Sequence, residues 1–214
     1  GALTYVFVGS RGTYRVNARM LEELGLPGER EHVSNLGALI AHEIAAPEKR
    51  PACIVDPECD DELPPIAREA GQPGIERRSL SHALNLKAAA RHAACTLGAR
   101  YEEINLVVAH LGGGISVSAH CRGRMVDVNQ GLDGTGPFSP DRAGGLPIGD
   151  VMRMATSGRY TYDELFRLVT RRGGLLAHLG TNDAREVERR IAAGDDHARL
   201  IYEAMAYQIA KEIG

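Results

Sequence analysis

His110 lies close to three consecutive glycines, Gly112, Gly113 and Gly114, and this group is the clearest sign of chemistry in the chain. Residues without a Cβ allow backbone N–H groups to approach an anion, and such a nest suits phosphate. His110 and Ser116 could add side-chain donors. A dinucleotide fingerprint or a P-loop would need residues that this stretch lacks. The alternative is a hairpin whose glycines only relieve crowding, with His110 as a core residue.

Arg142 is a second candidate, and it lies in a glycine- and proline-rich segment, residues 129–150, that lacks periodicity. A loop of that length inside a compact domain is usually functional or disordered, and the presence of Arg142 and of aspartates without any repeat favours function. The guanidinium is a permanently charged planar fork that suits phosphate or carboxylate. The alternative is an arginine that pairs with Asp141 or Asp150 and only holds the loop.

Two further candidates come earlier in the chain. Asp56 ends a short apolar run, and open α/β sheets place ligand groups at the ends of strands, although such an aspartate can instead cap the next helix. His82 and Asn85 are three residues apart in a predicted helix and share one of its faces. We expect Lys87 and Arg91, further along, to lie on a solvated face.

The hydrophobic pattern predicts the elements that position these residues. The apolar run Ile104–Leu111 predicts a buried central strand, and the alternation over Ile115–His120 predicts a second strand, so the glycines form the turn between them. A long helix is predicted over residues 79–97, and its expected apolar face comprises Leu80, Leu84, Ala88 and Cys95. We expect one α/β domain over residues 1–214, with a mixed central sheet within about residues 1–130, the loop of residues 129–150 and a helical part over residues 151–214.

Composition excludes several classes of protein. With 43% hydrophobic and 25% charged residues the chain is an ordinary globular protein, and a net charge of −3 argues against nucleic acid as a partner. No apolar run approaches the roughly 20 residues of a membrane span, and no secretory signal is visible, so we expect a cytoplasmic location. The four cysteines show neither zinc-binding spacing nor a disulfide framework, and the eight histidines show no metal-binding spacing. Cys53 and Cys95 are expected to be buried.

Longer stretches of the sequence resemble a known family. Three of them surround the glycine turn and the loop: VAHLGGGISV at 108–117, RMVDVN at 124–129 and LDGTGPFSPDRAGGLP at 132–147. Further stretches extend the resemblance over nearly the whole chain: 12–17, 31–37, 54–57, 78–87, 180–187 and 203–214. This text resembles the butyrate kinases of the acetate kinase family, within the superfamily of actin-like ATPases, sugar kinases and Hsp70 chaperones.

The resemblance implies an actin-like, ribonuclease H-like lobe with an incomplete second lobe. It implies ATP-dependent phosphorylation of butyrate or another short- or branched-chain carboxylate, with ATP and Mg²⁺ as cofactors and a homo-oligomer as the assembly. Arg142 would stabilise the phosphoryl group in transfer, His110 would be an active-site histidine, Asp56 would orient Mg²⁺ or the acceptor, and His82 would lie beside the site. The alternatives are an acetate or propionate kinase, or a non-catalytic binding fragment of such a kinase. The family's first phosphate hairpin and its adenosine site have no counterpart in this sequence, so we expect little ATP turnover by the chain alone.

Overall fold

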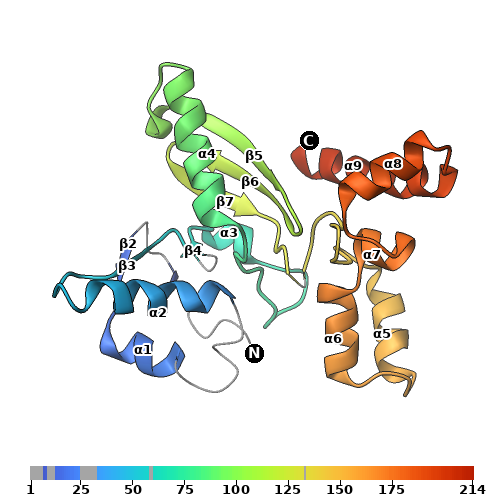
Figure 1. The fold of residues 1–214 in the computed structure, drawn as a ribbon, viewed down its shortest axis with the longest axis horizontal. Helices are drawn as coiled ribbons and strands as arrows, with labels where there is room; N and C mark the ends of the chain where they lie inside the picture. Colours follow the sequence, from blue (N-terminus) through green and yellow to red (C-terminus); the bar gives the residue numbers. More distant parts are fainter. Residues whose placement is uncertain (1–6, 9–12, 25–32, 58–59, 133) are drawn as a thin grey trace.

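The computed structural model describes residues 7–8, 13–24, 33–57, 60–132 and 134–214. Their strands form three sheets (Figure 1). Strand β1 (Phe7–Val8) pairs in parallel with β4 (Asp60–Asp61), and β2 (Thr13–Arg15) pairs antiparallel with β3 (Cys53–Val55). The third sheet is antiparallel, in the order β5 (Asn105–Leu111), β6 (Ile115–Cys121), β7 (Arg124–Val128). The predicted α/β class is confirmed, with the described strands divided among three sheets instead of joined in one.

The N-terminal part packs two helices against the β2–β3 pair. Helix α1 (Ala18–Leu24) begins after Asn17, whose side chain accepts a hydrogen bond from the backbone N–H of Met20 at 2.9 Å, a normal N-terminal cap. Helix α2 (Val33–Ala45) follows. The small core of this part comprises Val16, Met20, Leu24, Ala38 and Ala52.

Helix α4 (Ala83–Thr96) covers one face of the β5–β6–β7 sheet (Figure 1). The short helix α3 (Pro65–Arg68) precedes it and a 3₁₀ turn (Tyr101–Glu103) follows it. The buried face of α4 differs from the predicted one: it comprises Ala83, Leu86, Lys87, Ala90 and Ala94. Leu84 is 54% exposed, because the alanines, with their small side chains, turn toward the sheet and let the helix approach it closely.

Strand β5 is an edge strand, and the prediction of a buried central strand was wrong. Val107 is 53% and Leu111 63% exposed, because α4 covers only one face of β5 and, among the described strands, only β6 pairs with it. Strand β6 holds the central position instead, and both of its faces are buried. An apolar run predicts a strand but does not say which neighbours will cover it.

The C-terminal part is helical, as predicted. It comprises α5 (Ile148–Thr156), α6 (Tyr162–Arg171), α7 (Gly174–Leu179), α8 (Ala184–Ala192) and α9 (Asp196–Ile213). The largest core joins Ile115 and Val117 of β6 to Leu175 of α7, Val187 of α8 and Ile201 of α9. This packing brings the helical part against the sheet beside the glycine turn. In the portion of the chain that the structure describes, no helix is long and apolar enough to cross a membrane.

The cysteines depart from their prediction. Cys53, Cys95 and Cys121 are all exposed and free, whereas Cys53 and Cys95 were expected to be buried. Cys53 lies on the outward side of the two-stranded β2–β3 ladder, and Cys95 lies on the part of α4 that faces away from the sheet. The fourth cysteine, Cys59, is outside the described residues.

Candidate functional site

The predicted turn at Gly112, Gly113 and Gly114 joins β5 to β6. Leu111 pairs with Ile115, and the backbone N–H of Gly112 donates to the carbonyl of Gly114 at 3.1 Å. A Cβ on Gly112 would lie 2.7 Å from Nε2 of His110, and one on Gly114 would lie 2.6 Å from Nη1 of Arg142. Glycine is therefore needed at both positions for the close approach of these two side chains.

Two histidines stack beside this turn. His110 lies at the end of β5 and His82 immediately before α4, and their ring centroids are 3.8 Å apart with the planes 14° from parallel. Nδ1 of His110 is 2.9 Å from Oδ1 of Asn85, and Nδ1 of His82 is 2.9 Å from Oγ of Ser116. Ser116 is fully buried and directed at His82, so its predicted part as an anion donor stays a prediction. Partial burial lowers the pKa of His110 below its ordinary value, which favours the neutral imidazole at pH 7.

Arg142 reaches the same turn from the loop. Its Nη1 donates to the carbonyl of Gly131 at 2.6 Å. Ser139 fixes the loop to the turn: its hydroxyl donates to the carbonyl of Gly113 at 2.6 Å and accepts from the backbone N–H of Arg142 at 3.2 Å. Arg142, Gly131 and Ser139 also line a small cavity between the loop and the start of β6.

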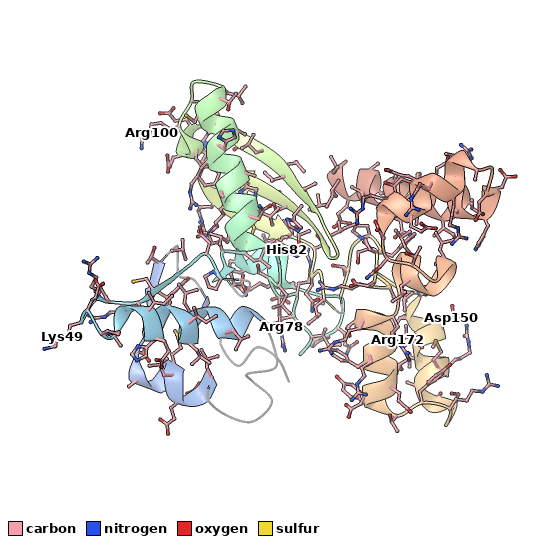
Figure 2. The ribbon with its side chains drawn as sticks, in the orientation of Figure 1. Lys49, Arg78, His82, Arg100, Asp150 and Arg172 are labelled. Carbon is pink, nitrogen blue, oxygen red and sulfur yellow. The ribbon has the colours of Figure 1, made fainter. Side chains whose placement is uncertain are left out.

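Among the described residues Arg142 forms no ion pair within 4.0 Å with Asp141 or Asp150, the partners that a loop anchor was expected to use. Asp150 pairs with Arg153 on α5, well apart from His82 in Figure 2. Asp141 directs Oδ2 toward the turn, 4.0 Å from where a Cβ on Gly113 would stand. Its Oδ1 is buried without a hydrogen-bond partner in the described part of the chain, and burial raises the pKa of this carboxyl while Arg142 opposes the rise. The guanidinium of Arg142 is therefore held by backbone oxygen beside the turn.

Asp56 lies in a separate buried ion cluster. It follows β3 directly, with a left-handed backbone (φ 42°), and its oxygens contact Nζ of Lys87 at 3.3 Å and Nη1 of Arg91 at 3.0 Å. Lys87 also pairs with Glu62 at 3.1 Å. Both carboxylate oxygens of Asp56 thus contact cations, an arrangement that ties β3 to α4. In the described residues no three His, Cys, Asp or Glu side chains cluster in a way that could hold a metal ion. The part of Asp56 in orienting Mg²⁺ or the acceptor stays a prediction.

The prediction of a solvated face for Lys87 was wrong. The Lys87 side chain is only 3% exposed, whereas that of Arg91 is 49% exposed. A buried carboxylate is costly without a paired charge, and Lys87 lies four residues after Ala83 on the face of α4 that packs inward. The four-residue spacing from Ala83 was the signal in the sequence that could have predicted burial of Lys87. Its acidic partners, Asp56 and Glu62, could not be identified because they come from distant parts of the sequence.

A buried polar relay across the sheet was also missed. The Ser118 hydroxyl donates to the carbonyl of Val108, so Nε2 of His120 donates to Ser118 at 2.8 Å and Nδ1 accepts from the Tyr101 hydroxyl at 2.6 Å. Burial, with Lys87 nearby, lowers the pKa of His120 to about 4, and burial raises the pKa of Tyr101 to about 12. The His120 imidazole and the Tyr101 hydroxyl are therefore both neutral at pH 7, and they are hydrogen-bonded to each other.

The fold of the chain is similar to that of several solved kinases. Its structure is similar to that of the acetate kinase of Porphyromonas gingivalis, with a TM-score of 0.80 and 20% identity over 100% of this chain and 56% of that one. It is similar to a propionate kinase from Francisella tularensis subsp. tularensis SCHU S4, with a TM-score of 0.80 and 23% identity over 98% of this chain and 57% of that one. It is also similar to the acetate kinase of Entamoeba histolytica, with a TM-score of 0.79 and 17% identity over 100% of this chain and 58% of that one. At these identities the likeness establishes the fold.

A match to a family model identifies the family of this chain. Residues 65–214 match the family model of the acetokinase family, and the chain belongs to that family. The chain spans a little over half the length of the solved relatives named above. The expected acetate kinase family and its fold are therefore confirmed, and the narrower resemblance to butyrate kinases stays a prediction.

Proposed function

We propose that this chain carries the phosphoryl-binding part of an ATP-dependent carboxylate kinase, which forms an acyl phosphate reversibly from a short-chain carboxylate. The observation that carries the proposal is the convergence of His110, His82 and Arg142 on the glycine turn between β5 and β6. Membership of the acetokinase family supports the same reaction class.

Phosphoryl transfer to a carboxylate needs few catalytic groups from the protein. The carboxylate oxygen of the acceptor is already an anionic nucleophile, so no strong general base is needed. What remains is to hold the transferred phosphoryl group in line and to offset charge on its equatorial oxygens. The backbone N–H groups of Gly113 and Gly114 can bind one oxygen, and the guanidinium of Arg142 can exchange its bond to Gly131 for a bond to a second oxygen. When Mg²⁺ is bound with the nucleotide, it neutralises charge on the phosphate oxygens.

For the acceptor we propose butyrate or a branched relative, with acetate and propionate as the competing substrates. The motif text around the turn and the loop supports butyrate. The solved relatives bear the names of acetate and propionate kinases. An acyl phosphate carries both the phosphoryl group and the acceptor. The affinities of acetyl, propionyl and butyryl phosphate therefore report the preferred acceptor without any turnover.

The test is the affinity of the 214-residue chain for acetyl, propionyl and butyryl phosphate, measured by calorimetry. We expect butyryl phosphate to bind most tightly, and we expect Arg142→Ala to weaken binding at least tenfold. The matched control is Arg100→Ala, because Arg100 is an exposed arginine at the far end of α4 (Figure 2). Hydroxylamine trapping of acyl phosphate from ATP and each acid measures turnover in parallel. Failure of all three acyl phosphates to bind, or equal binding by both arginine variants, would contradict the proposal.

A further inference from the structure

The side chain of Asn85 is the hydrogen-bond partner of His110. Its Oδ1 lies 2.9 Å from Nδ1 of His110, and an amide oxygen can only accept a hydrogen bond. The proton of the neutral imidazole is therefore on Nδ1, and the lone pair is on Nε2. Nε2 is the atom that faces the glycine turn, since a Cβ on Gly112 would lie only 2.7 Å from it.

We propose that Asn85 is the positioning residue of His110: it fixes the Nδ1–H form so that Nε2 takes up a proton and donates it to an anion bound at the glycine turn. The identity of that anion, a phosphoryl group, rests on the proposed function. Asn85 is an exposed residue in the first turn of α4, and its contact with β5 ties the helix to the strand that ends at the turn.

The surroundings of His110 explain why the proton would arrive with the anion. The His82 ring stacks on His110 at a centroid distance of 3.8 Å, and Arg142 places a permanent positive charge beside the same turn. Asp141, across Gly113, is an acidic group that faces the turn, and burial raises the pKa of its carboxyl. Partial burial also lowers the pKa of His110. An anion at the turn would offset these effects, so binding and protonation become linked.

The experiment is imidazole NMR on the 214-residue chain, which reports both the tautomer and the pKa of His110. The informative variant is Asn85→Asp, because a carboxylate in place of the amide stabilises the imidazolium and should raise the pKa by about one unit or more. The matched control is Asn105→Asp at the other end of β5, exposed and roughly 17 Å away by strand geometry, where screening should leave the pKa nearly unchanged. Asn85→Leu removes the acceptor and should redistribute the proton between the two ring nitrogens.

The outcomes separate this inference from the proposed function. An Nδ1–H tautomer in the unaltered chain, with a pKa that rises in Asn85→Asp and not in Asn105→Asp, supports the positioning role. An Nε2–H tautomer, or equal pKa values in the two aspartate variants, overturns it, whether or not phosphate binds. Inorganic phosphate is then added: a rise in the pKa of His110 supports linked protonation. If the tautomer is as expected and phosphate leaves His110 unchanged, the tautomer role of Asn85 stands, whereas linked protonation and the phosphoryl site both fail.

Discussion

Replacement of Gly114 by alanine should damage phosphate binding while leaving the fold intact. The added methyl group would lie 2.6 Å from Nη1 of Arg142 and 3.1 Å from Cε1 of His82, well inside the 3.5–4.0 Å of a normal contact. Of these two neighbours the guanidinium is the more mobile, since it ends a long, half-buried side chain. It must therefore move by about 1 Å, which breaks its 2.6 Å hydrogen bond to Gly131 and withdraws it from the turn.

The size of the effect follows from that one displaced charge. A hydrogen bond to a charged group contributes about 1.5–3 kcal/mol, and about 1.4 kcal/mol corresponds to a tenfold change in affinity. We therefore expect Gly114→Ala to weaken phosphate binding about 10- to 150-fold. The free energy of unfolding should change by no more than about 1 kcal/mol, because the glycine backbone here does not need a positive φ.

Calorimetric titration with inorganic phosphate measures the affinity, and urea unfolding measures the stability. The matched control is Gly37→Ala in α2, where the same methyl group would meet no atom within 4 Å. Equal phosphate affinity in Gly114→Ala and Gly37→Ala would refute the placement of Arg142 at the anion site. If the Gly114→Ala variant does not fold, the argument that the Arg142 guanidinium moves to make room for the methyl group is refuted.

Three further predictions concern charge. Lys87→Met leaves buried Asp56 and Glu62 without their ammonium, so urea unfolding should show a loss of about 3 kcal/mol; a loss below about 1 kcal/mol would contradict the buried cluster. The unfolded chain binds a proton on His120 near pH 6.5 and the folded chain only near pH 4, so stability should fall by about 3 kcal/mol as the pH drops through that range. In His120→Gln that part of the pH dependence should vanish, and an unchanged pH profile would contradict a neutral buried imidazole. In an enzyme with a complete nucleotide site, Arg142→Ala should lower kcat roughly 10³-fold, and near-normal turnover would make Arg142 a loop residue only.

Local patterns predicted the turn and the loop well. The strands on either side of Gly112–Gly114 and the irregular segment that carries Arg142 follow from composition and periodicity, which act over a few residues. The structure brings His110, His82 and Arg142 to one turn, although His82 and Arg142 are far apart in the sequence. The catalytic parts assigned to them remain predictions.

The environment of individual residues could not be predicted in the same way. Whether Lys87 is solvated depends on Asp56 and Glu62, which come from a different part of the chain and approach it only in the folded state. Likewise, His120 alternates with apolar residues as an outward-facing side chain would, but the central position of β6 buries both faces of the strand. Periodicity identifies faces of an element, and the neighbours that cover each face are set by the tertiary fold.

The most direct test of the anion site follows the backbone amide signals of Gly112, Gly113 and Gly114 by NMR during titration with inorganic phosphate. If the glycine turn is the phosphoryl site, these amides should shift together and saturably, along with the side-chain signals of Arg142 and His110. The shifts should be absent in Gly114→Ala and kept in Gly37→Ala. A titration that leaves the three glycine amides unchanged, or that moves only signals elsewhere in the protein, would contradict the account.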